Sequence, residues 1–317
     1  MDRNLALEFV RVTEAAAIAS AHWMGKGDKE KADNAAVEQM RKTFSDIPFD
    51  GKVVIGEGER DEAPMLYIGE DVGQGTGADI DIAVDPLECT NSVAFGRPNA
   101  ISVLAAAPRG CMLGAPDTYM DKIAVGPEAK GCIDLDAPVK DNIRAVADAL
   151  GKDVKDVTVV VLDRDRHKEL IAKIRAENAR IFLIPDGDIS GGIAPSMPES
   201  GIDMLLGTGA APEGVITAAA LKCMGGEIQG RLAFRNNDEK KRARDMGVDD
   251  PEQKFLVNDL VNGPDCMFAA TGVSTGPLLS GVVFCREGAI THSLVMHMKT
   301  LTKRFIETHH VTKGGDI

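Results

Sequence analysis

Basic and aromatic residues are scarce in this chain of 317 residues. It contains 36 Lys and Arg against 49 Asp and Glu, which gives a formal net charge of −13, and it has only one Trp and two Tyr. Proteins that bind nucleic acids or anionic membranes through charge need clustered basic residues, so we expect neither partner. The excess acidic side chains must either solvate the surface or hold cations.

Long apolar runs and closely paired cysteines are also missing. No apolar run approaches the ~20 residues of a membrane-spanning helix, and residues 1–5 do not resemble the start of a signal peptide. The six cysteines contain no Cys-x-x-Cys pair, a pattern typical of buried free thiols in a reducing cytoplasm. We therefore expect a cytoplasmic protein, with a redox-active cysteine pair as the alternative.

Several common catalytic motifs do not occur. The sequence has no His-Glu-x-x-His and no Gly-x4-Gly-Lys-Ser/Thr, so zinc-protease and P-loop chemistry have no support. We interpret His22, His292 and His297 as structural or surface residues. The tail over 309–317 ends in Gly-Gly-Asp-Ile and is expected to fray.

Hydrophobic periodicity predicts alternating helices and strands. In residues 79–85, Ile80, Ile82 and Val84 recur at every second position, which is the period of a strand. Helices are expected over 4–24, 31–44, 139–150, 167–177 and 214–224, further strands over 53–55, 101–107, 157–162, 181–184 and 204–206, and a solvated helix or excursion over 235–254. This alternation favours an α/β protein whose helices pack on the faces of a sheet. A weak boundary near 150–156 separates two lobes, 1–155 and 156–317.

The sequence Asp-Pro-Leu-Glu-Cys-Thr at residues 85–90 is the most informative motif. The preceding strand delivers Asp85 at its carboxyl end, where open sheets place ligand sites. Pro86 restricts the backbone and is expected to form a turn that brings Glu88 beside Asp85. Two adjacent carboxylates favour a hard cation such as Mg²⁺ or Mn²⁺. The alternative is a strand followed by a capped helix.

Further acidic residues occur at the ends of predicted elements. Glu57 lies between two glycines after a short strand, Asp28 and Asp33 lie at the start of the second helix, and Glu213 lies at the start of another. Each of the last three has an alternative role as a helix cap or a partner of the helix dipole. Together they predict a two-metal site that polarises a phosphate and activates water.

Groups suited to holding a phosphate follow two later strands. Arg164 and Arg166 come after the strand over 157–162, and arginine binds phosphate through paired hydrogen bonds. Their alternative is a surface pair bound to the neighbouring aspartates. Asp186 and Asp188 follow the next strand and are candidates to accept hydrogen bonds from sugar hydroxyls, while the Gly-rich turn over 207–211 offers main-chain amides.

These motifs together resemble the class II fructose-1,6-bisphosphatase family, within the lithium-sensitive phosphatase superfamily. The segment 85–90 is similar to the superfamily's Asp-Pro-x-Asp/Glu-Gly-Thr metal motif. Val-Val-Ile-Gly-Glu-Gly-Glu at 53–59, Asp-Glu-Ala-Pro-Met-Leu-Tyr-Ile-Gly-Glu at 61–70, Pro-Asp-Gly-Asp at 185–188 and Ala-Ala-Pro-Glu-Gly at 210–214 also resemble that family. The resemblance extends from about residue 5 to about residue 310.

The resemblance implies an α/β/α/β/α layered sugar-phosphatase fold of two closely packed lobes, with metal binding in 1–155 and sugar-phosphate binding in 156–317. It implies hydrolysis of the 1-phosphate of fructose 1,6-bisphosphate with Mn²⁺ or Mg²⁺, in gluconeogenesis or the Calvin cycle, by a homodimer or homotetramer. The implied catalytic residues are Thr90, Glu57 and Asp85, and the implied metal ligands are Asp33, Glu57, Asp85, Glu88 and Glu213. The implied substrate-binding residues are Lys29, Glu88, Cys89, Thr90, Tyr119, Arg164, Asp165, Arg166, Asp186, Gly187, Asp188 and Ala210.

Two positions depart from the family pattern. Cys89 stands where the motif has glycine, and a side chain there is strained by about 1 kcal/mol or more if the position needs a positive φ. Ala210 also replaces a glycine, which is harmless if only its amide is used. Four alternatives accompany the main interpretation: sedoheptulose-1,7-bisphosphatase or another sugar bisphosphatase activity, an inositol-phosphate phosphatase of the same superfamily, a non-catalytic metal and sugar-phosphate sensor, and a redox-gated enzyme.

Overall fold

The computed structural model describes residues 1, 4–58 and 65–311. The chain forms two compact units: unit 1 comprises Met1–Cys111 and Pro264–Ile317, and unit 2 comprises Met112–Gly263. The division thus falls at 111/112 and 263/264 rather than at the predicted 155/156. Neither of the two points at which the chain passes between the units was predicted, because neither point has the composition of a linker. The predicted boundary lies inside unit 2 instead. The roles predicted for the two lobes stay predictions.

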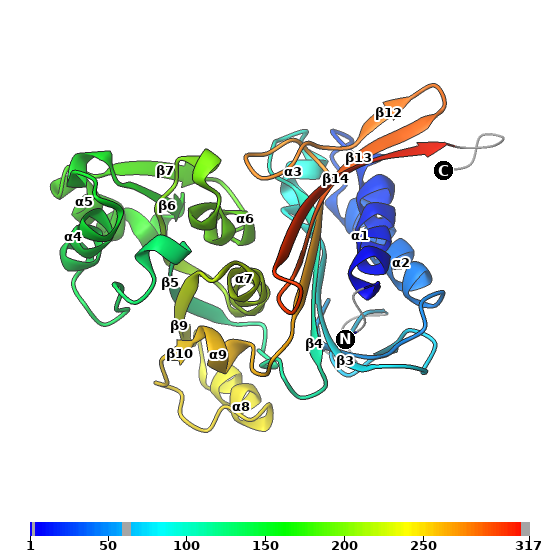
Figure 1. Ribbon diagram of the computed structural model, residues 1–317, viewed down its shortest axis with the longest axis horizontal. Helices are drawn as coiled ribbons and strands as arrows, with labels where there is room; N and C mark the ends of the chain where they lie inside the picture. The colour runs from blue at the N-terminus through cyan, green and yellow to red at the C-terminus, as the bar shows by residue number, and fades with distance from the viewer. Residues whose placement is uncertain (2–3, 59–64, 312–317) are drawn as a thin grey trace. The chain divides into compact units, whose positions relative to one another are not determined.

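Unit 1 is built on an eight-stranded sheet with the order β12-β13-β11-β4-β3-β1-β2, in which β14 pairs with β13. Helices α1 and α2 lie side by side on one face of this sheet (Figure 1). Its strands are β1 (Asp50–Ile55), β2 (Asp71–Val72), β3 (Asp79–Glu88), β4 (Ile101–Pro108), β11 (Met267–Gly272), β12 (Val283–Cys285), β13 (Gly288–His297) and β14 (Thr302–Val311). Its helices are α1 (Leu5–Ala21), α2 (Lys29–Phe44) and α3 (Thr90–Ala94).

The core of unit 1 lies between the two long helices and the sheet. Phe9 of α1 packs edge-on against Phe49 with ring centroids 5.5 Å apart, and Phe44 of α2 lies 5.8 Å from the same ring. All three rings are at most 1% exposed. Burying such rings removes a large apolar area from water, so this contact fixes α1 and α2 beneath strands β1 and β3.

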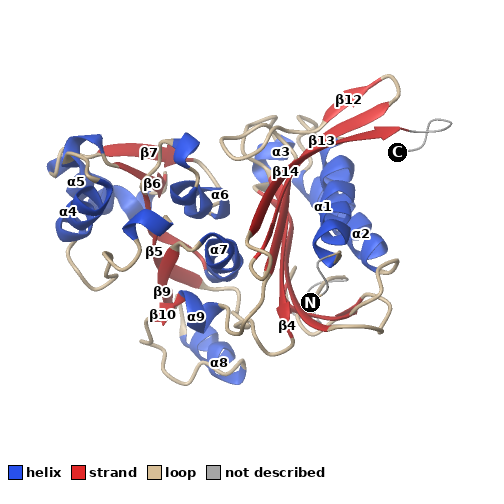
Figure 2. Cartoon of the chain, in the orientation of Figure 1, coloured by secondary structure: helices blue, strands red, loops and turns tan. Residues whose placement is uncertain are grey.

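Unit 2 is built on a six-stranded sheet with the order β10-β9-β5-β8-β6-β7. Helices α4 and α5 pack on one face and α6 and α7 on the other (Figure 2). Its strands are β5 (Tyr119–Val125), β6 (Thr158–Leu162), β7 (Arg180–Ile184), β8 (Met204–Ala210), β9 (Glu227–Ala233) and β10 (Phe255–Leu256). Its α-helices are α4 (Val139–Leu150), α5 (Lys168–Ala176), α6 (Ile189–Ile193), α7 (Ala211–Met224), α8 (Asn237–Asp245) and α9 (Val257–Leu260). Its 3-10 turns are η1 (Pro127–Ala129), η2 (Val154–Asp156), η3 (Asp165–His167), η4 (Ala194–Ser196) and η5 (Pro198–Ser200).

The mixed α/β class is confirmed, and most predicted elements are present. Every predicted helix and strand overlaps one in the structure, including α8 within the charged stretch 235–254. The strands β2, β5, β9, β10, β11, β12, β13 and β14 were not predicted. The expectation that the tail frays from residue 309 is wrong for 309–311, because β14 pairs with β13 up to Val311; the rest of the tail lies outside the described residues.

The histidines and cysteines have varied surroundings. His22 stacks on Phe284 with ring centroids 4.3 Å apart, and buried His297 lies 2.9 Å from Asp265, as expected of structural residues. None of the six cysteines, all of which lie in the described part of the chain, forms a disulfide, and only Cys89 and Cys266 are buried, so the expectation that most of them are buried is wrong. No helix in the described part of the chain is long and apolar enough to cross a bilayer.

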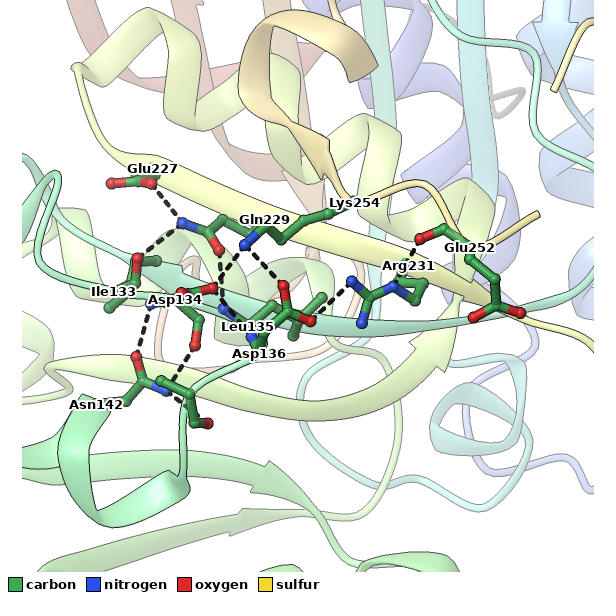
Figure 3. A network of polar contacts seen from close by, with 11 residues as sticks. Ile133, Asp134, Leu135, Asp136, Asn142, Glu227, Gln229, Arg231, Glu252 and Lys254 are labelled. Atoms are coloured by element: carbon green, nitrogen blue, oxygen red, sulfur yellow. Dashed lines mark hydrogen bonds and ion pairs between the residues drawn. The ribbon is translucent and has the colours of Figure 1, made fainter. Parts of the chain in front are cut away.

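A network of charged and amide side chains fastens the loop before α4 to β9 (Figure 3). The ammonium of Lys254 lies 2.6 Å from Asp134 and 2.9 Å from Asp136, and Arg231 lies 2.8 Å from Asp136. The amide of Gln229 accepts from the Leu135 N–H and donates to the Ile133 carbonyl. Lys254, at the end of the charged stretch, therefore ties the residues before β10 to the loop before α4.

Candidate active site

The motif at 85–90 forms an irregular strand end in unit 1. The predicted turn at Pro86 is instead a bulge within β3: Asp85 pairs with Val103 and Glu88 with Ile101, so two residues of β3 oppose one of β4. Val103 and Ile101 are two positions apart and share one face of the sheet, so their partners share it as well. The bulge therefore brings Asp85 and Glu88 to the same face, which a regular strand would not do.

Two more carboxylates belong to this acidic group. Asp33 lies in the second turn of α2 and Glu57 directly follows β1. Burial raises the pKa of Glu57 well above its ordinary value, and the negative charges of Asp33 and Asp85 raise it further. Burial also raises the pKa of Asp33, to about 6. Three of the predicted metal ligands are thus close enough to repel one another.

This donor set suits a hard divalent cation. Carboxylate oxygens are the ligands that Mg²⁺ and Mn²⁺ prefer, and a cation among them would offset the mutual repulsion. Residues 1, 4–58 and 65–311 contain no set of three or more His, Cys, Asp or Glu already arranged as a metal cage. Glu59, which follows Gly58, and the first four residues of the motif at 61–70 lie outside these ranges.

Cys89 adopts the backbone conformation that favours glycine. Its φ is 71° and its ψ is 51°, in the left-handed region, and its side chain is 8% exposed. Thr90 follows as the first residue of the short helix α3. Glycine suits this position in the family motif because glycine adopts a positive φ without strain. At Cys89 the same backbone, which leads into Thr90, costs roughly 1–3 kcal/mol.

The predicted residues at the start of α2 have different roles. Asp28 caps the helix, because its carboxylate accepts a hydrogen bond from the Lys31 N–H at 3.0 Å. Lys29 is the first helical residue and is exposed. The cap alternative is therefore confirmed for Asp28, while Asp33 belongs with the acidic group.

In unit 2, the loops after β6, β7 and β8 meet at one edge of the sheet. These three strands are parallel, and the carboxyl ends of parallel strands lie at the same edge. Arg164 after β6 lies 2.8 Å from Asp186 after β7. The alternative of a pair bound to neighbouring aspartates is thus wrong for Arg164; Asp165, beside it, is exposed and pairs with Lys168.

Arg166 is held against β8 and Tyr119. Its Nε and Nη2 donate to the Thr208 carbonyl at 3.0 and 2.8 Å, and its guanidinium carbon lies 4.8 Å from the centre of the Tyr119 ring. Arg235, which the sequence did not single out, lies 5.1 Å from the same ring. Its Nε lies 2.5 Å from Glu239, which is 1% exposed. Two cations therefore flank one predicted substrate-binding aromatic residue.

His167 supports the same loop. Its Nε2 lies 2.8 Å from the Thr208 N–H, and its Nδ1 lies 2.7 Å from the Leu162 carbonyl. Because a main-chain N–H only donates, Nε2 must accept and Nδ1 must carry the proton. Burial lowers the pKa of His167, in agreement with a neutral ring.

The remaining predicted residues of unit 2 surround a buried lysine that the sequence did not reveal. Lys122 of β5 is 1% exposed, and its ammonium lies 2.6 Å from Oδ1 of Asp188 and 3.0 Å from the Ala210 carbonyl. Glu213, in the first turn of α7, lies 3.8 Å from the same ammonium. The only signal in the sequence is a lysine beside Asp121 within the otherwise apolar residues of 120–125, which on its own suggests a surface position.

Comparison with known proteins agrees with this chemistry. The family model described as bacterial fructose-1,6-bisphosphatase, glpX-encoded, matches residues 3–310. The chain belongs to this class II fructose-1,6-bisphosphatase family.

Relatives in cyanobacteria are similar over nearly their whole length. Proteins named D-fructose 1,6-bisphosphatase class 2/sedoheptulose 1,7-bisphosphatase are 46% identical in Synechococcus sp. (strain JA-3-3Ab), over 99% of this chain and 97% of that protein, and 45% identical in Crocosphaera subtropica, over 98% and 97%. The resemblance read from the motifs is therefore confirmed, as is the class of enzyme. The class II family is one of divalent-metal-dependent sugar phosphatases in carbohydrate metabolism.

Proposed function

We propose that the protein hydrolyses the 1-phosphate of fructose 1,6-bisphosphate to fructose 6-phosphate and phosphate, using Mg²⁺ or Mn²⁺. The observation that carries the proposal is the acidic group of unit 1, in which Asp33 and Asp85 raise the pKa of Glu57. Together with Glu88, these carboxylates would hold the metal; Glu213 of unit 2 stays a predicted ligand through the resemblance. When bound, such ions polarise the phosphoryl group and stabilise the charge that develops on it.

Thr90 is the residue proposed to orient the attacking water. A hydroxyl both donates and accepts hydrogen bonds, so it can hold a water molecule in one direction while carboxylates accept the water's protons. Glu57 and Asp85 are the proposed carboxylates. The strained backbone at Cys89 supports this role, because strain of this kind is commonly retained where a neighbouring group must be held in place.

Unit 2 is proposed to bind the sugar and its distal 6-phosphate. Arg164 and Arg166 present guanidinium groups whose planar N–H donors match phosphate oxygens, and Tyr119 lies against Arg166. Asp186 and Gly187 follow β7 at the same edge, where Gly187 has a positive φ of 62°. Binding of a remote phosphate by these groups would hold the reacting phosphate in place.

The decisive experiment is phosphate release from fructose 1,6-bisphosphate by the purified protein with Mg²⁺ or Mn²⁺. We expect release of one phosphate per sugar, with none in EDTA and none from fructose 6-phosphate. Thr90→Ala should nearly abolish turnover while leaving substrate binding intact. A protein that releases no phosphate with either metal overturns the proposal, and normal turnover by Thr90→Ala removes Thr90 from the mechanism.

Sedoheptulose 1,7-bisphosphate is a second candidate substrate, because the names of the cyanobacterial relatives include that activity. It shares the phosphate at carbon 1 and carries its distal phosphate one carbon further along the sugar. Turnover of both substrates at comparable kcat/KM would assign a dual function, in gluconeogenesis or the Calvin cycle. Turnover of the fructose compound alone would restrict the enzyme to it.

We also propose that the enzyme acts in the cytoplasm as a homodimer or homotetramer. Strand β14 supports self-association: among the described strands it pairs only with β13, and Phe305 on it is 54% exposed. An exposed strand edge of this length readily pairs with another chain. Sedimentation at micromolar concentration tests this proposal, and a single monomeric species contradicts it.

A further inference from the structure

We propose that Lys122 and Asp188 form a buried ion pair whose role is to position two groups of the active site, the Ala210 carbonyl and the Glu213 carboxylate. In this assignment Lys122 is a positioning residue, and Asp188 acts with it rather than by direct contact with the sugar. The inference rests on the proposed function, in which Ala210 and Glu213 serve the substrate and the metal.

The geometry of the pair is unusually close. The Lys122 ammonium lies 2.6 Å from Oδ1 and 2.5 Å from Oδ2 of Asp188. The side chains are 1% and 3% exposed. A carboxylate that is so fully buried, with both oxygens against one ammonium, offers little surface to a sugar hydroxyl. Its position is that of a counter-ion for Lys122.

The lysine joins the starts of two helices. Asp188 precedes α6, Ala210 precedes α7, and Glu213 lies in the first turn of α7. The ammonium donates to the Ala210 carbonyl at 3.0 Å and lies 3.8 Å from the Glu213 carboxylate, which is 22% exposed. Lys122 thus anchors the inner side of the segment 210–213, while the Glu213 carboxylate stays within reach of solvent.

Two glycines make room for the pair. A Cβ on Gly209 would meet Oδ2 of Asp188 at 2.0 Å and Nζ of Lys122 at 2.8 Å, and a Cβ on Gly214 would meet Sδ of Met120 at 2.7 Å and Cδ of Lys122 at 3.2 Å. Neither glycine has a positive φ. The space around the ion pair therefore explains glycine at position 209, and the stem of Lys122 together with Met120 explains glycine at position 214.

Stability alone does not explain a buried lysine here. Removing an ammonium and a carboxylate from water costs several kcal/mol per ion, and well-packed apolar residues are often equally stable or more so. Lys122 lies on β5 between Met120 and Ala124, both fully buried, where an apolar side chain would continue the pattern. The charge of Lys122 is explained if the ammonium orients the Ala210 carbonyl and the Glu213 carboxylate at the start of α7.

The test compares Lys122→Met with the double variant Lys122→Met/Asp188→Asn in the full-length protein. In Lys122→Met we expect the Kd for Mn²⁺, measured by electron paramagnetic resonance without substrate, to rise at least ~10-fold, as happens when a group that orients a metal ligand is lost. The rate of amide hydrogen exchange in peptides covering 209–214 should also rise about 10-fold. Lys152→Met is the matched control, since its ammonium lies 2.5 Å from Asp203 at the start of β8; it should change neither quantity.

The double variant separates positioning from folding. Removing both charges should restore the free energy of unfolding but leave Mn²⁺ binding weak and exchange at 209–214 fast. Lys122 is a structural residue, and the inference is overturned, if Mn²⁺ binding and slow exchange at 209–214 return together with stability in the double variant. The same holds if Lys122→Met changes neither Mn²⁺ binding nor exchange. These readouts do not depend on turnover. A wild-type protein that releases no phosphate therefore contradicts the proposed function, whereas an active wild type with unaffected variants contradicts only this inference.

Discussion

The guanidinium of Arg164 lies 2.8 Å from the carboxylate of Asp186. Arg164 follows β6 and Asp186 follows β7, so this ion pair joins two loops that leave neighbouring parallel strands. An arginine fixed at one N–H presents its other donors in a defined direction. In the proposed function, this orientation would let Arg164 bind the distal phosphate without a strongly basic surface.

Loss of the Arg164 guanidinium should weaken substrate binding more than turnover. Arg164→Met is expected to raise KM for fructose 1,6-bisphosphate about 10-fold, the effect of one charge-assisted hydrogen bond, with little change in kcat. Steady-state kinetics measures both. Arg144→Met is the control, because Arg144 pairs with Glu177 on the surface. Fructose 1-phosphate lacks the distal phosphate and should not distinguish wild type from Arg164→Met; an equal loss with both sugars would contradict distal-phosphate binding.

Neutralising Glu57 should stabilise the metal-free protein while abolishing metal binding. The pKa of Glu57 is raised in the folded state, so its ionised form disfavours folding at every pH above its ordinary pKa. Glu57→Gln is thus expected to raise the melting temperature in EDTA at pH 7 and to remove the further rise that Mn²⁺ gives the wild type. Scanning calorimetry with and without Mn²⁺ measures both shifts. Glu38→Gln, at an exposed position on α2, should change neither.

Glycine at position 89 should relieve backbone strain. Because Cys89 has a φ of 71°, Cys89→Gly is expected to raise the free energy of unfolding by up to about 1 kcal/mol, the strain relief less the added chain entropy. Cys89→Ala keeps the strained backbone and should bring no gain. Urea denaturation compares the two. We expect kcat of Cys89→Gly to stay within about 3-fold of the wild type, whereas a gain of orders of magnitude would favour the sensor alternative.

Acid should weaken the loop that His167 supports. The ordinary pKa of histidine is 6.5, and burial lowers the pKa of His167 in the folded state, so the unfolded chain binds the proton more readily. The stabilisation is complete above pH 6.5 and is lost as the pH falls from 6.5 through the lower folded pKa. Below that range the Thr208 N–H loses its acceptor, which costs about 1 kcal/mol.

This dependence is measurable by urea denaturation between pH 7.5 and about 5. In His167→Gln, a neutral amide can accept from Thr208 at every pH, so the part of the pH dependence due to His167 should vanish. His309→Gln is the control, because His309 lies exposed on β14. An unchanged slope in His167→Gln would show that another group carries the dependence.

Local sequence patterns predicted the individual elements near the acidic group better than they predicted which strands pair and in what register. The alternation through Ile80 and Ile82 identified β3, but Pro86 suggested a turn where the chain forms a bulge. The difference depends on β4, a partner whose register cannot be read from residues 79–90 alone. Strands β13 and β14 were missed for a related reason, since β13 is completed by its pairing with β11, β12 and β14, and β14 by its pairing with β13.

The residues proposed to touch ligands were easier to find from the sequence than the buried charges around them. Asp33, Glu57 and Asp85 stand in motifs with glycine or proline nearby, and the structure brings these three carboxylates together. Lys122 and Glu239 are charged residues in ordinary surroundings along the chain, and only tertiary packing buries them. Sequence patterns report local backbone requirements, whereas the pairing of a buried charge depends on segments far away in the chain.

Unit 2 is inserted in the sequence between the two segments of unit 1, so it could be removed or exchanged as one continuous piece of chain. The two ends of unit 2 meet, because Met112 bridges Val261 and the Leu113 N–H donates to the Leu260 carbonyl at 2.9 Å. In unit 1, β4 and β11 are antiparallel neighbours with Ala106 opposite Met267, so a short hairpin could join the chain where unit 2 leaves it. The two ends of unit 2 therefore lie close together, as do the two points at which the chain of unit 1 is interrupted, so recombination between relatives could exchange unit 2 as a whole without changing the strand order of unit 1.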